Sequence, residues 1–207
     1  MIDAAALERH RGRWRRRALG LATDAFRAEE RAVRANGRRG FSTARWDAAL
    51  TTVWRGSANE WIPKVESMIG ISKDAVAESG LAKELIRIIH TKAEAIVDVT
   101  EADWLLLGDA AWDTADTRAV TFSQSEAVQS TAWSQHRTAE KVPKLRKIWV
   151  SIIDQRTRAT HLSANGQVRL LNNPFSVGGA SLQWPADTGG PLSEIINCRC
   201  WEDYELR

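Results

Sequence analysis

Apolar residues recur at intervals of three, four and seven through the first 140 or so residues, which is the period of α-helices with one buried face. The first such segment covers residues 4–34 and is rich in Ala, Arg, Leu and Glu. The sequence Asn-Gly-Arg-Arg-Gly at 36–40 predicts its end, and Ser42 or Thr43 can cap a second helix. We expect Pro63 to bend the chain there.

Three more helices are predicted before residue 143. The first has an apolar face over residues 73–97 and Ser72 as its cap. Sequences that resemble a capping box, with Ser or Thr followed three residues later by an acid, open the other two at 100–103 and 123–126. His136 lies at the tail of the last helix, where we expect a surface position.

The helical period ends at Pro143, and the remaining residues contain Pro, Gly and both cysteines. Residues 147–153 are typical of a buried strand, and a tight Asn-Gly turn precedes a second strand at 167–171. Residues 198–204 can form a last strand. The stretch 172–191 is predicted to be mostly loop.

These patterns predict an α+β protein in two parts. Residues 1–142 form a helical region, and residues 143–207 form a small mixed α/β domain with a short antiparallel sheet. A chain of 207 residues with 43% hydrophobic and 27% charged residues can bury a core, and collagen-like, coiled-coil and wholly disordered classes fit poorly. No secretory signal or membrane-spanning run is visible, so we expect synthesis in a cytoplasm and no membrane partner.

Charge is distributed unevenly along the chain. The formal net charge is only +3, but the first forty residues hold eleven Arg against five acids. Six of these arginines fall within nine residues: Arg9, Arg11, Arg13, Arg15, Arg16 and Arg17. Such clustering favours contact with double-stranded DNA, without sequence specificity, or with an acidic protein face. The alternative is a solvated helix face.

Ten Trp residues stand against four Phe and one Tyr. Trp46, Trp54 and Trp61 recur at intervals of seven or eight, which stacks them along one side of a helix. They are interpreted first as core and second as a surface that docks another chain. Trp14 lies inside the arginine run, where it can pack or stack on an exposed base.

Cys198 and Cys200 are two residues apart, so on a strand their side chains share a face. With His161, and with Asp154 or Asp187 as a fourth group, they can form a tetrahedral zinc site. The alternatives are a strained disulfide and two packed thiols, of which the thiols are the simplest interpretation.

The same residue types also suit a Cys/His-dependent hydrolase or nuclease. Either thiol can serve as nucleophile, His161 as base and Asp154 as the group that orients it. Arginines at 156, 158 and 199 flank the set and can bind phosphate. However, the sequence shows no paired carboxylates at a metal-binding spacing and no Gly-rich loop between a strand and a helix. We therefore expect no catalysis.

An ordered set of sequence blocks extends over residues 147–201. A Trp-led strand is followed by Asp-x-Arg-x-Arg-x-x-His at 154–161, Gly-Gln at 166–167, Pro-Phe at 174–175, Pro-x-Asp at 185–187 and Asn-Cys-Arg-Cys at 197–200. In this order the blocks resemble the tailed-bacteriophage head morphogenesis family, the Mu F-like minor head proteins. The helices before residue 115 carry no such block, and there the resemblance extends only to layout.

The resemblance implies a minor head protein of a phage or prophage, associated with the portal and carried inside the capsid with the DNA. Its implied partners are the portal protein and capsid components. Its implied role is assembly, genome packaging or delivery, without turnover chemistry.

Overall fold

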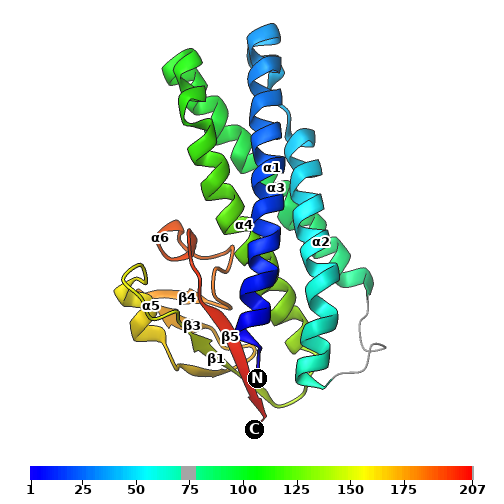
Figure 1. Ribbon diagram of the computed structural model, residues 1–207, viewed down its shortest axis with the longest axis vertical. Helices are drawn as coiled ribbons and strands as arrows, with labels where there is room; N and C mark the ends of the chain where they lie inside the picture. The colour runs from blue at the N-terminus through cyan, green and yellow to red at the C-terminus, as the bar shows by residue number, and fades with distance from the viewer. Residues whose placement is uncertain (71–77, 207) are drawn as a thin grey trace.

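Four long helices make up the first two thirds of the molecule in the computed structural model, which describes residues 1–70 and 78–206. They are α1 (Ala4–Asn36), α2 (Thr43–Ile69), α3 (Glu78–Leu107) and α4 (Ala115–Ala139), with the 3-10 segments η1 (Gly37–Gly40) and η3 (Gly108–Thr114) between them. Figure 1 shows the helices side by side, with the strands gathered against α1 and α4 near the end where both termini lie. No helix in the described part of the chain is both long and apolar enough to cross a membrane.

The C-terminal part contains two small antiparallel sheets. In the first, β1 (Leu145–Val150) lies between β2 (Val168–Leu170) and β5 (Trp201–Leu206). In the second, β3 (Phe175–Val177) pairs with β4 (Ala180–Leu182). The short helices α5 (Ala159–Ala164) and α6 (Leu192–Ile195) complete this part. The predicted α+β class is confirmed, while the division into two domains stays a prediction.

The first two helices begin where the sequence predicts, but Pro63 does not mark a boundary. Helix α2 continues through Pro63 to Ile69, and Gly70 ends it in a left-handed conformation at φ 76°. Proline removes one helical hydrogen bond, but Trp61 and Val65 on either side are fully buried. Their burial, at about 2 kcal/mol per side chain, outweighs that loss.

The predicted boundary at residues 100–103 is wrong. Helix α3 runs through this position because Thr100 does not cap a new helix: its hydroxyl donates to the Ile96 carbonyl at 2.7 Å and accepts from Arg118 at 2.7 Å. The helix predicted to begin near Ser123 lies inside α4, and the Ser123 hydroxyl donates to the Val120 carbonyl. The predicted cap at Ser72 lies outside the described residues.

The strands differ from their predicted bounds by a few residues. β1 ends at Val150, so Ile153 is exposed, and β5 begins at Trp201, after both cysteines. The β3–β4 hairpin falls in the segment predicted as loop. Each of its strands has three residues, which is too short for an alternating pattern to stand out.

The tryptophan stripe on α2 is core. Trp46, Trp54 and Trp61 are fully buried, so the alternative that they dock another chain is wrong. Two of their indoles donate to buried carboxylates, Trp46 to Glu29 at 3.0 Å and Trp54 to Glu126 at 2.7 Å. Burial raises the pKa of Glu29. Each carboxylate therefore orients an indole whose N–H would otherwise lack a partner in the core.

Trp14, which lies within the arginine run, also packs inside the bundle. It is 5% exposed, and its indole N–H donates to Glu60 at 3.2 Å. Its ring lies so close to Gly56 of α2 that a methyl group there would overlap it. Glycine is thus required in the middle of α2 to let α1 approach, and the alternative that Trp14 stacks on a base is wrong.

A buried arginine joins α1 to the C-terminal part. Arg11 is 5% exposed, and its guanidinium donates to the backbone carbonyls of Arg199 at 2.9 Å and Cys200 at 3.1 Å. Glu8 lies 3.6 Å from the same group. Arg11 was predicted as a nucleic-acid contact, but its guanidinium is buried and donates to carbonyls of the same chain.

A buried ion pair joins α4 to β5. His136 is 1% exposed, so its predicted surface position is wrong. Its Nδ1 lies 3.1 Å from the Glu202 carboxylate, and the neighbouring Gln135 amide donates to the Glu202 carbonyl. Burial alone would lower the pKa of His136, but the charge of Glu202 and hydrogen bonds to Glu140 and Glu202 raise it to about 9.

We predict that Arg11→Ala lowers the free energy of unfolding by about 3 kcal/mol, because two buried carbonyls lose a charged donor. Arg13→Ala removes an exposed arginine from the same helix and should cost less than about 1 kcal/mol. Urea denaturation at neutral pH measures both. Equal losses in the two variants would contradict the joining role of Arg11.

We predict that His136 contributes to stability at low pH and loses this contribution at high pH. Its folded pKa of about 9 lies above the ordinary 6.5, so the contribution is complete below about pH 6.5 and disappears as the pH rises through 9. The shift corresponds to on the order of 3 kcal/mol. The difference in unfolding free energy between wild type and His136→Gln should therefore shrink by about that amount between pH 6 and pH 10.

Urea titrations of wild type and His136→Gln across this range measure the difference. His90→Gln, which changes an exposed histidine on α3, should leave the wild-type pH profile unchanged. A wild-type to His136→Gln difference that stays constant with pH would refute the ion pair.

Candidate functional site

Three side chains with metal-binding atoms meet inside the C-terminal part. His161 comes from α5, while Cys198 and Cys200 come from the segment between α6 and β5. His161 Nδ1 lies 3.4 Å from Cys200 Sγ and 3.8 Å from Cys198 Sγ. All three residues are 2% exposed, and their ligand atoms lie within 4.8 Å of one another. The structure thus brings together three of the four residues predicted from the sequence.

The other nitrogen of His161 faces a carboxylate. Nε2 lies 3.1 Å from Glu194 on α6, and Thr160 donates to the same carboxylate oxygen at 2.9 Å. A hydrogen bond from Nε2–H to Glu194 holds the ring so that Nδ1 faces the two sulfurs. Glu194 had no predicted role, although it stands four residues before Cys198, just upstream of the Asn-Cys-Arg-Cys block.

The two thiols share one environment. The neighbouring Cys198 thiol and His161 surround the Cys200 sulfur and lower the pKa of Cys200. The pKa of Cys198 is raised well above its ordinary value, because it hydrogen-bonds to Cys200 and is buried.

Asp154 was predicted as the fourth ligand, but it lies outside this cluster. Its two carboxylate oxygens accept from Arg199 at 2.5 and 2.7 Å, and one also accepts from the Arg156 amide at 3.0 Å. These hydrogen bonds lower the pKa of Asp154. Asp187, the other candidate, accepts from the amides of Gln183 and Gly189 and holds the loop after β4. Neither carboxylate is directed at the sulfurs.

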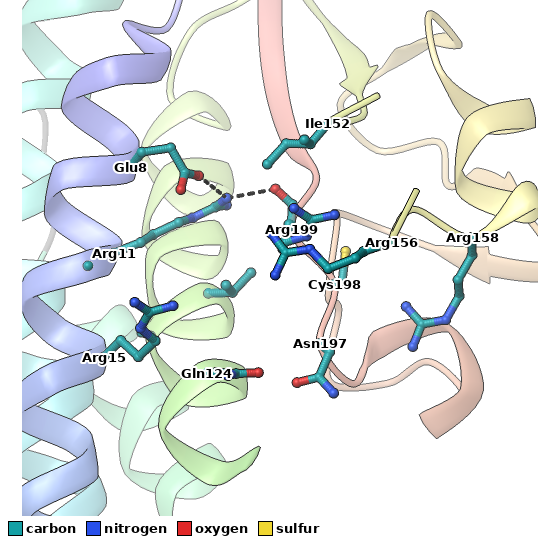
Figure 2. A pocket seen from close by; sticks show the side chains of 13 residues that line it. Glu8, Arg11, Arg15, Gln124, Ile152, Arg156, Arg158, Asn197, Cys198 and Arg199 are labelled. Atoms are coloured by element: carbon teal, nitrogen blue, oxygen red, sulfur yellow. Dashed lines mark hydrogen bonds and ion pairs between the residues drawn. The ribbon is translucent and has the colours of Figure 1, made fainter. Parts of the chain in front are cut away.

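An arginine-lined cleft of about 580 Å³ opens beside the cluster, between α1, α4 and the C-terminal part. Figure 2 shows Arg15 and Arg11 reaching into it from α1, opposite Arg199. The cleft is also lined by Arg156, Arg158, Glu8, Gln124, Asn197 and Cys198. Arg158 donates to the Ile196 carbonyl at 2.6 Å, so part of this positive charge is fixed by the fold.

The other predicted DNA contacts lie at the surface of α1, with Arg15 on the side of the cleft. Arg9, Arg13, Arg15, Arg16 and Arg17 are all exposed. Arg17 lies over the Trp14 ring, 5.4 Å from its centroid, and Arg13 pairs with Glu60. The five guanidiniums remain at the surface, where a phosphate backbone can approach them.

The geometry fits the hydrolase alternative less well. His161 has Glu194, and not Asp154, as its carboxylate partner. The cavity that borders the two thiols and His161 measures only about 10 Å³, which is space for about one water molecule. Cys198 also borders the larger arginine-lined cleft, but Cys200 and His161 do not, so a substrate in that cleft would not meet the thiol and its base together.

Comparison with known proteins gives one match. The family model described as phage Mu protein F like protein matches residues 47–202, which is most of the chain. Neither the curated proteins nor the solved structures contain a significant match. The matched region includes most of α2, all of α3 and α4, strands β1 to β4, His161 and the two cysteines, and it ends two residues into β5. The chain therefore belongs to the phage Mu protein F like family.

Proposed function

We propose that this protein is a minor head protein that associates with the portal and occupies the capsid interior, where it assists genome packaging or delivery. Family membership over residues 47–202 carries this proposal, since the family indicates a phage head morphogenesis protein and a virion component. Association with the portal goes further, and rests on the resemblance of the ordered C-terminal blocks to Mu F-like minor head proteins.

Two structural observations support an assembly role over an enzymatic one. The blocks of the resemblance serve the fold: Trp149 is fully buried, and Asp154 forms an ion pair with Arg199. The thiols and His161 are buried as well. Most of these residues are buried, and the exposed Asp154 is bonded to Arg199, so the blocks hold the C-terminal part together, as a structural component requires.

We further propose that the exposed arginines of α1 contact the packaged genome. Five of the six arginines between residues 9 and 17 lie at the surface of one helix. Guanidinium groups spaced along a helix can each neutralise a phosphate, and such binding is independent of sequence. Contact with an acidic capsid face uses the same charges and is the competing explanation.

Portal association predicts that the protein is found in mature particles and is recovered with the portal. A tagged copy produced in an induced lysogen should co-purify with the portal protein after nuclease treatment, because the proposed association does not depend on DNA. It should resist protease in intact particles and become sensitive when the capsids are opened. Absence from mature particles, together with no portal or capsid component in the purified fraction, would sink the proposal.

The DNA contact predicts a steep salt dependence for a short non-specific duplex. Each phosphate contact contributes about −0.9 to the slope of log K against log salt, so four contacts weaken binding about 100-fold between 50 and 200 mM salt. We propose to replace four exposed arginines by Gln: Arg13, Arg15, Arg16 and Arg17. The slope of this variant should be shallower by up to about 4.

A matched control removes the same charge from exposed positions on other parts of the chain: Arg55, Lys83, Arg87 and Lys144, each to Gln. Fluorescence anisotropy measures all three proteins. The control should keep most of the wild-type slope. If both variants lose affinity equally, the effect follows net charge, and the assignment of the contact to α1 is wrong.

A further inference from the structure

We propose that His161, Cys198 and Cys200 bind one zinc ion, with a water molecule as the fourth ligand. In a tetrahedral site, zinc–sulfur distances of about 2.3 Å and zinc–nitrogen distances of about 2.0–2.1 Å place sulfur and nitrogen about 3.6 Å apart. The observed separations of Nδ1 from the two sulfurs, 3.4 and 3.8 Å, lie on either side of this value. The nitrogen is therefore already spaced from both sulfurs as in the ligand set of one ion, and all three atoms lie within 4.8 Å of one another.

The choice of ligands points to zinc. Two thiols and an imidazole form a set of borderline and soft donors, which disfavours magnesium and calcium. All three are 2% exposed, and burial protects thiolate ligands from competing solvent. Cysteines in a bacterial cytoplasm are also kept reduced, which keeps them available to the metal.

The surroundings of His161 match those of a metal ligand. Its Nε2 lies 3.1 Å from Glu194, and Thr160 in turn donates to that carboxylate. A histidine that ligates a metal through one nitrogen commonly donates the other N–H to a carboxylate, which fixes the ring and makes it a better ligand. A histidine that only filled core space would not need its ring held from both sides.

The fourth position is assigned to water because, within the described residues, no further His, Cys, Asp or Glu side chain joins the three ligand atoms. Asp154 is held by Arg199, and its carboxylate lies outside the ligand group. The cavity of about 10 Å³ is bordered by all three ligands and has the size of one water. This proposal is independent of the proposed role in the phage head.

Metal analysis of the full chain, purified without chelator and passed through metal-free buffer, tests the proposal. Wild type should carry about one zinc per chain, and His161→Ala and Cys200→Ser should each lose most of it. His90→Ala is the matched control: it removes an exposed histidine that contacts Asp47 and Glu94 and should keep the zinc. Asp154→Asn should keep it too, because Asp154 is not a ligand.

A second measurement does not depend on the variants being folded. Cobalt added to metal-free wild type should give the intense visible bands of tetrahedral coordination and a thiolate-to-cobalt charge-transfer band, unchanged in Asp154→Asn. The proposal is overturned if folded wild type holds no zinc and gives no such bands, or if His161→Ala and Cys200→Ser keep the metal. Loss of the metal in Asp154→Asn would overturn the assignment of water as fourth ligand.

Discussion

The placement of one short segment, residues 198–204, against α1 and α4 is the constraint on which the rest of the C-terminal part depends. Arg11 holds its carbonyls at Arg199 and Cys200, and α4 holds it through Glu202. These are charged groups with little exposure, and removing one partner of such a pair costs far more than a surface pair contributes. Contacts with α1 and α4 thus hold both β5, an edge strand of the first sheet, and the two thiols in place.

Buried charged groups with bonding partners also organise the helical core. Large indoles fill the space between the helices, and each of the carboxylates of Glu29, Glu126 and Glu60 accepts from an indole N–H. Lys92 neutralises Glu126 at 2.8 Å, so the buried charge has a partner. Trp14, Trp46 and Trp54 are therefore each paired with an acid on another helix, and these side chains serve packing with a defined orientation rather than a docking surface.

The sequence was sufficient to predict what depends on local pattern. The α+β class and the starts of α1 and α2 follow from periodicity and turn residues. The proximity of His161 to the two cysteines is long-range, and only the metal-binding chemistry of these residue types suggested it. What it missed depends on long-range contacts. Arg11 and His136 have the sequence pattern of surface residues, and they are buried because the segment that carries Cys200 and Glu202 packs against them. Thr100 has the pattern of a helix cap, but its hydroxyl accepts from Arg118. Glu194 could be found only once α5 and α6 were adjacent.

The contacts that position the cysteine cluster do not depend on a metal ion. Because Arg11 and Glu194 position Cys200 and His161 through bonds that involve no metal, the ligand geometry is built by the fold. An ion that binds a preformed site stabilises the folded state by mass action, in proportion to its affinity and concentration, whereas an ion that creates its site is required for folding. The helices, whose main core contains none of the three ligands, do not need the ion to pack. Zinc at this site would therefore act on the C-terminal part and on its joint with α1, which is also where the arginine-lined cleft opens.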